Sequence, residues 1–458
     1  METCFNIIAF SVLTAVPITL IWNKSQSSHK KLQPPSPWKL PIIGHLHHLS
    51  GAPPHHSLRK VSQKYGPLFH LQLGEIPAIV VSSPRFAKEV MRTQDLTFAN
   101  RALFLAGKIM CYDYADIVFA PYGEYWREMR KICSSELLSP KSVRSYVSIR
   151  QEEASNLIRS IQNAAIGNST PINLTEKLAE YTSSMVVRAA FGRVSKDDQN
   201  AFLELVQEAW PYTSSFEVSD LFPSMKILHH FLSIENELMK IHHKLDQVLD
   251  NIINDYLEEN LARSEASSSS VEQGNEDLID VLLRVKEDKD LPIRITMENI
   301  KAVLIDVFTG GTETSSSTVE WAMAEMIRHP EVLAKAQEEI RTAFMEKEVI
   351  EEAGIQELKY LKLVVKETLR LHPPVPLLVP RESREQTEID GYIINLSLFS
   401  GQLEETPSTG TIQSVSNRRD SKIVTKISLE ITSSLYHLAR EEGCAQVYLL
   451  VLLMCIFH

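Results

Sequence analysis

One long helical segment dominates this sequence and limits the folds that it can adopt. Residues Thr296 to Arg328 contain no proline, and Pro330 follows as a stop signal. The middle of the segment is the run Gly310 to Ser315, GGTETS. Two glycines inside a helix cost about 1 kcal/mol each relative to alanine, so an undemanding surface helix would not place them there. The run therefore predicts a special role for this stretch of the helix.

The residues alone leave two interpretations of the glycine pair open. In the first, Gly310 and Gly311 provide a face without side chains, where a large flat ligand can approach the backbone. Glu313 and Thr314 beside that face would then supply an acid and a hydroxyl that relay protons. In the second, the glycines permit close packing of another helix, and the Thr and Ser residues form a cap-like cluster.

Two shorter motifs combine charged side chains at helical spacing. Glu367 and Arg370, in LKLVVKETLRLHPP, lie at i and i+3 and can pair, and the flanking leucines predict a partly buried helix in which the pair matters. The alternative is an exposed pair worth under about 1 kcal/mol. Trp126 and Arg130, in WREMR, present an indole N–H and a guanidinium on one face, which can hold a carboxylate. The alternative there is a core tryptophan beside a solvated arginine.

Composition excludes several classes of protein. The net charge of -11 argues against a nucleic-acid binder, and 44% hydrophobic residues argue against a disordered chain. Cysteines without CxxC spacing exclude a disulfide framework and a cysteine-rich zinc site, so we expect no metal site built from clustered cysteines. The five cysteines are Cys4, Cys111, Cys133, Cys444 and Cys455.

The N-terminal residues predict a membrane anchor. Asn6 to Trp22 is apolar and just long enough to cross a bilayer, and the lysines after it place the rest of the chain in the cytosol. A cleaved signal peptide is the alternative, but the acidic Glu2 and the bulky end of the run argue against it. We assign residues 1–22 to the anchor and 23–50 to a linker that contains the proline-rich PPSPWKLPIIG.

From about His56 onward the pattern predicts long amphipathic helices, with short strands in LFHLQLG and AIVVSS. The polar segment Ser264 to Asp277 predicts a surface loop between two helices of one core, the first ending near Leu261.

Together these motifs resemble the cytochromes P-450, the haem-thiolate monooxygenases, and specifically the plant microsomal kind that includes terpenoid hydroxylases. PPSPWKLPIIG, WREMR, GGTETS, ETLR and PPVPLLVPRES occur in the family's order, and the resemblance extends from Met1 to about Ile394. It implies a mainly α fold with a small β region, formed by a monooxygenase domain over residues 51–395 that is incomplete at its C-terminal haem-binding part.

The resemblance also implies roles for particular residues around haem. Trp126, Arg130 and Arg381 correspond to the contacts of the haem propionates. Gly310 and Gly311 correspond to the place where the central helix passes over the haem.

Four further residues correspond to the family's chemistry and its supporting structure. Glu313 and Thr314 match the oxygen-activating pair, and Glu367 and Arg370 match a structural ion pair of the haem-side core. Substrate contacts would fall on four stretches: Arg101 to Ile117, Ala209 to Leu221, the helix before Gly310, and Val375 to Val379.

The activity implied by the resemblance is insertion of one oxygen atom of O₂ into a lipophilic small molecule. It would use haem and electrons from an NADPH-dependent flavoprotein reductase, at the endoplasmic reticulum membrane with the body of the protein in the cytosol.

The C-terminal residues depart from the family. The loop Phe-x-x-Gly-x-Arg-x-Cys-x-Gly, whose thiolate binds the iron and favours O–O cleavage, does not occur, and Cys444 lies in the unrelated EEGCAQV. Translated in one shifted frame, residues 400–448 permit the family's three remaining motifs in order. We therefore interpret Leu396 to His458 as out-of-frame translation, rather than as a genuine novel tail, and predict that the chain as written is inactive.

Two other hypotheses stay open for this chain. It could be a haemless, membrane-anchored binding or regulatory protein, or the product of a gene-model or transcript error that does not accumulate.

Overall fold

The computed structural model describes residues 33–167, 172–192, 194–213, 216–225, 234–266, 276–344, 352–355, 357–394 and 398–401. Its backbone contacts divide the chain into two compact units. Unit 1 comprises the described residues up to Ala102, residues 217–225, and those from Pro376 onward. Unit 2 comprises the described residues from Leu103 to Phe216 and those within 234–375. The boundaries at residues 22, 50 and 395, which follow sequence motifs, stay predictions.

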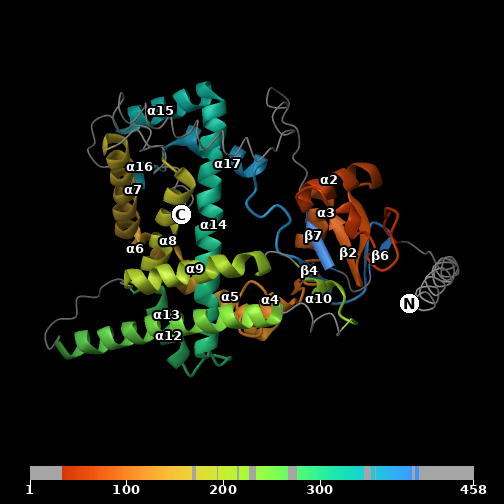
Figure 1. Cartoon of the computed structure of the whole chain (residues 1–458), viewed down its shortest axis with the longest axis horizontal. Helices are drawn as coiled ribbons and strands as arrows, with labels where there is room; N and C mark the ends of the chain where they lie inside the picture. Colours follow the sequence, from red (N-terminus) through yellow and green to blue (C-terminus); the bar gives the residue numbers. More distant parts are fainter. Residues whose placement is uncertain are drawn as a thin grey trace, which may run out of the picture. The chain divides into compact units, whose positions relative to one another are not determined.

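Unit 1 contains a five-stranded sheet in the order β1-β2-β7-β4-β3 (Figure 1). β1 (Leu68–Leu73) and β2 (Ile76–Val81) pair antiparallel, which confirms both strands expected from the sequence. β7 (Leu398–Gly401) pairs parallel with β2 and antiparallel with β4 (Arg381–Glu382), and β4 pairs with β3 (Asn100–Arg101). β7 lies at the start of the segment that we interpret as out of frame. Backbone pairing there uses N–H and C=O groups that every non-proline residue supplies.

The remaining elements of unit 1 surround this sheet, and a small core of Leu68, Ile79, Val81, Phe86 and Phe98 lies among them. They are η2 (Leu46–His48), α2 (Pro54–Tyr65), α3 (Pro84–Lys88), η3 (Glu89–Thr93), α10 (Val218–Leu221), β5 (Thr387–Ile389) and β6 (Tyr392–Ile394). The turn between β1 and β2 requires Gly74, because its φ is +62° and a Cβ there would lie 2.4 Å from the carbonyl oxygen of Leu221.

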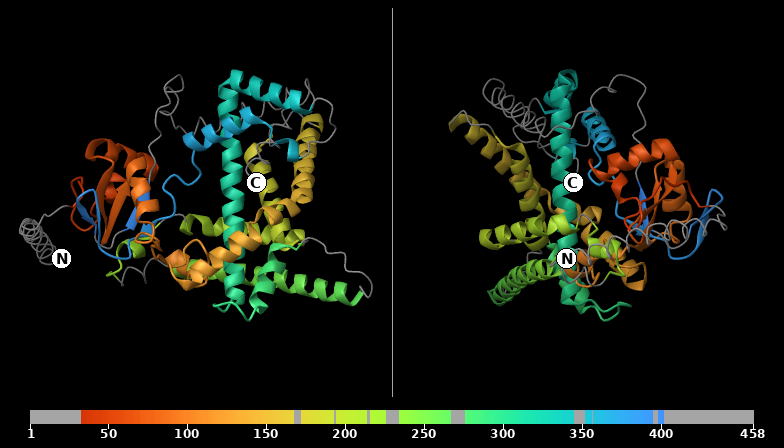
Figure 2. Two further views of the ribbon diagram at one scale, coloured as in Figure 1. Left: turned by 180° about the vertical axis from the view of Figure 1, so that it is seen from behind. Right: turned by 45° about the vertical axis from the view of Figure 1, so that its right-hand side comes forward.

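Unit 2 is helical and is organised along α14 (Met297–Arg328), which Figures 1 and 2 show running through it. The helix begins at a capping box in which Thr296 and Asn299 bond reciprocally, and it ends just before Pro330. These bounds confirm the predicted segment Thr296 to Arg328.

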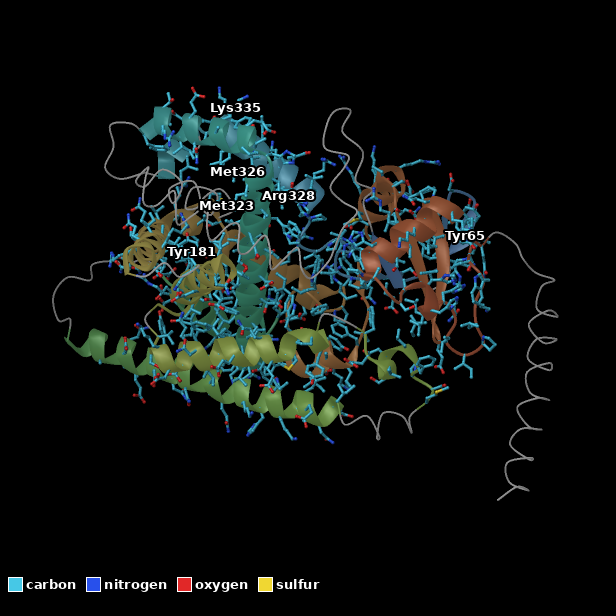
Figure 3. The ribbon with its side chains drawn as sticks, turned by 45° about the horizontal axis from the view of Figure 1, so that its top comes forward. Tyr65, Tyr181, Met323, Met326, Arg328 and Lys335 are labelled. Atoms are coloured by element: carbon cyan, nitrogen blue, oxygen red, sulfur yellow. The ribbon has the colours of Figure 1, made fainter. Side chains whose placement is uncertain are left out.

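α8 (Leu174–Phe191) makes the most extensive contact with α14, and α17 (Lys359–Leu371) packs against it near Trp321, whose ring stacks on His372 at 3.8 Å. Met323 and Met326 of α14 are almost fully buried (Figure 3). The other elements are α4 (Leu105–Met110), α5 (Glu124–Ile132), η4 (Cys133–Leu137), α6 (Pro140–Ser145), α7 (Val147–Gly167), α8 (Leu174–Phe191), α9 (Lys196–Thr213), α12 (Ile234–Ala266), α13 (Leu278–Glu287), α15 (Pro330–Phe344), α16 (Glu352–Ile355) and α17 (Lys359–Leu371).

Mainly helical structure with a small sheet confirms the predicted fold class. One boundary differs from the prediction, because α12 continues to Ala266 rather than ending near Leu261. Within the part of the chain that is described, no helix is both long and apolar enough to cross a bilayer. The predicted anchor at residues 6–22 lies outside the described residues.

Candidate functional site

The two glycines of α14 face different surroundings. A Cβ added at Gly310 would meet no heavy atom within 4 Å beyond its own helix, whereas one at Gly311 would lie 3.0 Å from Cγ2 of Val186 on α8. Each interpretation of the pair therefore applies to one residue. Gly311 permits close packing of α8, and Gly310 leaves an open, side-chain-free surface on α14.

Thr314 lies one turn after Gly310 and is bonded to it. Its hydroxyl donates to the carbonyl oxygen of Gly310 at 2.6 Å, and the hydroxyl of Thr318 donates to the carbonyl oxygen of Thr314 at 2.6 Å. The Thr314 oxygen still has lone pairs that can accept a proton while it donates. Its position beside the open surface suits a group that passes a proton to a ligand there.

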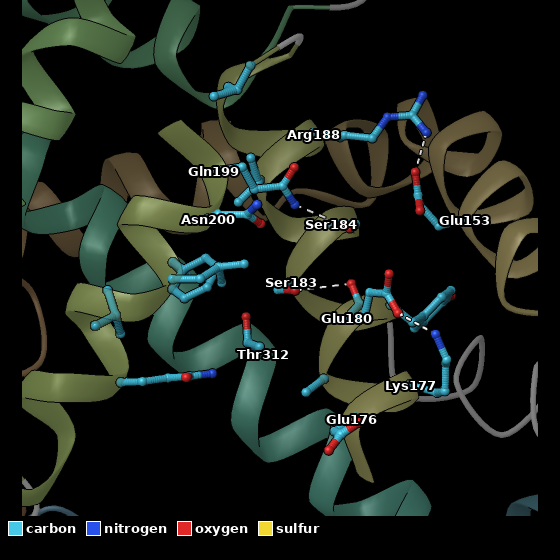
Figure 4. Close-up of a pocket in the computed structure, with 18 of the residues that line it drawn as sticks. Glu153, Glu176, Lys177, Glu180, Ser183, Ser184, Arg188, Gln199, Asn200 and Thr312 are labelled. Atoms are coloured by element: carbon cyan, nitrogen blue, oxygen red, sulfur yellow. Dashed lines mark hydrogen bonds and ion pairs between the residues drawn. The ribbon is translucent and has the colours of Figure 1, made fainter. Parts of the chain in front are cut away.

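Glu313 is exposed and lines a cavity of about 1260 Å³ enclosed by α7, α8, α9 and α14 (Figure 4). α14 contributes Phe308, Thr309, Thr312 and Glu313 to its wall. The Thr312 hydroxyl is buried and has no hydrogen-bond partner among the described residues. Such a cavity gives water a route to the Glu313 carboxylate.

Charged side chains of the neighbouring helices also line this cavity. Arg188 and Lys177, both on α8, form ion pairs with Glu153 of α7 and Glu180 at 2.5 Å and 2.9 Å. No single motif of the sequence predicts this cavity, because its walls come from helices far apart in the chain. Two of its lining residues, Thr312 and Glu313, lie within GGTETS.

Trp126 and Arg130 lie together on α5, as their spacing predicts. The guanidinium carbon of Arg130 is 5.0 Å from the centroid of the Trp126 ring, a cation–π contact, and Arg130 is exposed. The Trp126 indole N–H, however, donates to the carbonyl oxygen of Ile117 at 3.0 Å. In this structure the tryptophan therefore orients Arg130 and fixes the backbone at Ile117, and Arg130 is the group with charge to offer a carboxylate.

Arg381 belongs to unit 1, whereas Trp126 and Arg130 belong to unit 2. One of its terminal nitrogens donates to the Asp95 carboxylate at 2.8 Å, and it lies 3.4 Å from the carbonyl oxygen of Phe98. Its guanidinium is therefore already held by groups of unit 1.

Glu367 and Arg370 form the predicted pair in a two-point geometry. Nε and Nη2 of Arg370 donate to the two carboxylate oxygens of Glu367 at 2.8 Å and 2.6 Å. The hydrogen bonds from Arg370 lower the pKa of Glu367. The Arg370 and Glu367 side chains are 29% and 40% exposed. α17 is partly buried, as predicted, through Leu361, Val365 and Thr368, although Leu363 is 60% exposed. Water screens this pair, which reduces its contribution to stability.

The described cysteines do not fit an iron-bound thiolate. Cys111 and Cys133 are both buried and free of disulfides. Burial raises the pKa of Cys133 to about 12, with a further contribution from Asp306, and burial followed by the charges of Asp116 and Asp306 raises the pKa of Cys111. Both thiols therefore stay protonated near neutral pH. Cys4, Cys444 and Cys455 lie outside the described residues.

The open surface on α14 suits a flat macrocycle, because Gly310 leaves open space beside the Thr314 hydroxyl. Within the described part of the chain, no group of three or more His, Cys, Asp or Glu side chains is placed to hold a metal ion. The residues described would thus leave room for such a ligand at Gly310, and they include no cysteine within the family's cysteine loop.

Comparison with known proteins places these features in a family. Residues 34–396 match the model of the family described as cytochrome P450. Premnaspirodiene oxygenase of Hyoscyamus muticus is 53% identical over 373 residues, which cover 81% of this chain and 72% of that protein. 5-Epiaristolochene 1,3-dihydroxylase of Nicotiana tabacum is 50% identical, over 81% of this chain and 73% of that protein.

A solved structure shares the fold. A zebra fish cytochrome P450 determined with progesterone superposes with a TM-score of 0.64 at 22% identity, over 77% of this chain and 79% of that one. The matched family model spans most of the chain, and one curated relative is 53% identical over 81% of it. The chain therefore belongs to the cytochrome P450 family of oxygen-inserting enzymes, whose cofactor is haem.

Proposed function

We propose that this chain represents a membrane-anchored monooxygenase that hydroxylates a lipophilic small molecule of the terpenoid class. Two relatives that are about half identical over the matched region are named for the oxidation of terpenoids: premnaspirodiene oxygenase and 5-epiaristolochene 1,3-dihydroxylase. A terpenoid substrate offers apolar surface and few polar groups, so the chain would bind it mainly by excluding water.

The observation that carries the proposal is the open surface at Gly310. On the same turn of α14 the Thr314 hydroxyl is bonded to the Gly310 carbonyl, so the open surface has a proton-carrying group at its edge. Haem, when bound, supplies the oxygen chemistry of the family. The chain's own contribution at this surface is to leave room for a flat ligand and to hold a hydroxyl beside it.

Proton supply follows from the neighbouring residues. Glu313 lines the cavity that opens between α7, α8, α9 and α14, so its carboxylate can exchange protons with water. Thr314 is the next residue, and its hydroxyl both donates and accepts. We assign Glu313 to taking up protons and Thr314 to passing them to the ligand face.

The family resemblance assigns Arg130 of unit 2 and Arg381 of unit 1 each to the carboxylates of the cofactor's edge. Trp126 supports Arg130 through its ring, and Asp95 holds Arg381. Glu367 and Arg370 would keep the structural role that the resemblance implies for them. No step is assigned to an axial thiolate, because neither described cysteine fits that role.

The family resemblance implies a location and a redox partner for this chain. We expect residues 6–22 to anchor the chain in the endoplasmic reticulum membrane with its body in the cytosol, where an NADPH-dependent flavoprotein reductase would supply electrons. No nucleic acid is expected as a partner, given the acidic composition.

A second candidate function follows from the two protonated cysteines. With no described thiolate and no cysteine loop in the sequence, the chain as written would be inactive. It would then be a haemless binding or regulatory protein of the same fold, or a product that does not accumulate.

One experiment separates these candidates. The reduced, CO-bound absorption spectrum of the purified full chain is compared with that of a version whose reading frame is restored after Ile394. We expect a thiolate-type Soret band from the restored version and none from the chain as written. The same band in the chain as written would show that one of its cysteines reaches the iron, and our interpretation of residues 396–458 would be wrong.

A further inference from the structure

The segment from Cys111 to Phe119, which leads from α4 toward α5, has an unusual backbone. Tyr112, Asp113 and Tyr114 are three consecutive non-glycine residues in the left-handed region, with φ of 52°, 58° and 63°. L-residues avoid this region because Cβ approaches the following carbonyl oxygen, so such a run persists only where its surroundings hold it. We call this stretch the 111–119 segment.

Hydrogen bonds hold the first half of the segment. The Tyr112 hydroxyl donates to the Asp246 carboxylate of α12 at 2.8 Å, and the Tyr114 hydroxyl donates to the carbonyl oxygen of Phe104 at 2.9 Å. Lys301 of α14 also binds Asp246, at 2.6 Å, and Asp250, at 2.7 Å. The positive charge of Lys301 is therefore committed to α12.

Asp306 of α14 holds the second half. Its Oδ2 accepts the backbone N–H of Ile117 at 2.8 Å and that of Val118 at 3.2 Å. The carbonyl of Ile117 accepts the indole N–H of Trp126. The backbone of Ile117 is thus fixed on both sides, against the turn of α14 that leads to Gly310.

A second carboxyl group lies beside the first. Asp116 is fully buried, one of its oxygens accepts the N–H of Phe119 at 2.9 Å, and the other has no hydrogen-bond partner among the described residues. Burial raises the pKa of Asp116 to about 6, and burial together with the charge of Asp116 raises the pKa of Asp306.

Among the described residues, the titratable groups that face this pair carry no positive charge. They are the Cys111 thiol at the end of α4, the Tyr125 phenol of α5 and the Cys133 thiol of η4. Asp116 is fully buried and Asp306 is partly buried. Two neighbouring carboxylates in such surroundings repel one another and lose hydration, so the second ionises only at a cost.

We propose that Asp116 and Asp306 form a proton-dependent clasp that keeps the 111–119 segment against α14. While the pair holds a proton, Asp306 keeps the Ile117 and Val118 amides, and the strained backbone stays in place. When both carboxyls ionise, their repulsion opposes the closed arrangement, and the left-handed run at Tyr112 to Tyr114 favours release. The clasp is a property of the folded chain. Its use in admitting or retaining a substrate near Gly310 rests on the proposed function.

Hydrogen–deuterium exchange of the full chain tests the clasp without any ligand. After correction for the intrinsic exchange rate, protection of the Ile117 and Val118 amides should fall at least tenfold between about pH 5.5 and about pH 8, because opening is favoured by each proton lost. Protection that stays constant across this range would overturn the proposal.

Two variants and a matched control identify the groups. Asp116→Asn and Asp306→Asn each remove one charge while keeping an oxygen acceptor, so in either variant the pH dependence should shrink to less than about threefold. Asp113→Asn changes the same charge in the same segment at an exposed position, and it should keep the pH dependence of the unaltered chain. If either clasp variant retained the full pH dependence, or the control lost it, the clasp would be refuted. A failed CO spectrum with a positive exchange result would leave the clasp standing and remove only its link to catalysis.

Discussion

The contrast between Gly310 and Gly311 gives the sharpest test of the α14 surface. Both glycines lie mid-helix, so replacing either by alanine gains about 1 kcal/mol of helix propensity. At Gly310 the new methyl group enters open space, so the gain should appear in full. At Gly311 it would lie 3.0 Å from Cγ2 of Val186, a side chain that is buried between α8 and α14.

Overpacking of this kind costs about 1–3 kcal/mol, which cancels or exceeds the gain at Gly311. We therefore expect Gly310→Ala to raise the melting temperature of the full chain by about 1 °C and Gly311→Ala to leave it unchanged or lower it. Thermal unfolding followed by circular dichroism measures both variants.

A double variant locates the clash. Adding Val186→Ala to Gly311→Ala removes the crowded methyl groups, so the two changes together should cost less than the sum of their separate effects. Equal stabilisation by alanine at both glycines, with no coupling to Val186, would refute the packing of α8 against Gly311 and with it the distinction between a packed and an open glycine.

Three further predictions concern the other motifs. Glu367→Gln should lower the free energy of unfolding by less than about 1 kcal/mol, because the pair is partly exposed. Since the pKa of Glu367 is lowered, the contribution of the pair is present above the ordinary glutamate pKa and disappears as the pH falls through the lowered value. Urea titrations at several pH values measure this dependence. In a version with the reading frame restored, Thr314→Ala should separate oxygen consumption from product formation, with Thr318→Ala as the control; unchanged coupling would move the relay to Glu313. A tagged full chain should stay in the membrane pellet after a carbonate wash and lose part of that attachment when residues 1–23 are deleted, whereas release of the intact chain would contradict the anchor.

Local signals explain what the sequence predicted well. The bounds of α14 depend on a capping box at Thr296 and on Pro330, both within one turn of the helix ends. The first two strands follow from short runs of β-formers on either side of Gly74. The pairing of Glu367 with Arg370 follows from their spacing alone.

Long-range contacts explain what it missed. The exposure of Leu363 on α17 depends on which distant segments pack near it, and its neighbours in the sequence do not predict that exposure. The partner of the Trp126 indole is a backbone carbonyl nine residues earlier, which no side-chain pattern announces. Asp306 had no motif of its own, because its partners are backbone amides of a segment almost two hundred residues away.

The features of α14 lie on different faces because successive residues of a helix point about 100° apart. Asp306, Gly310 and Thr314 follow one another at intervals of four and therefore share a face. That face carries the clasp, the open surface and the hydroxyl, so the 111–119 segment held by Asp306 lies along the same side of the helix as the proposed ligand surface. Thr309, Thr312 and Glu313 are spaced by three and four and share the face that lines the cavity. Gly311 falls between these faces and meets α8. We therefore propose that a proton taken up from the cavity at Glu313 passes around the helix to Thr314, the next residue, whose side chain points about 100° away.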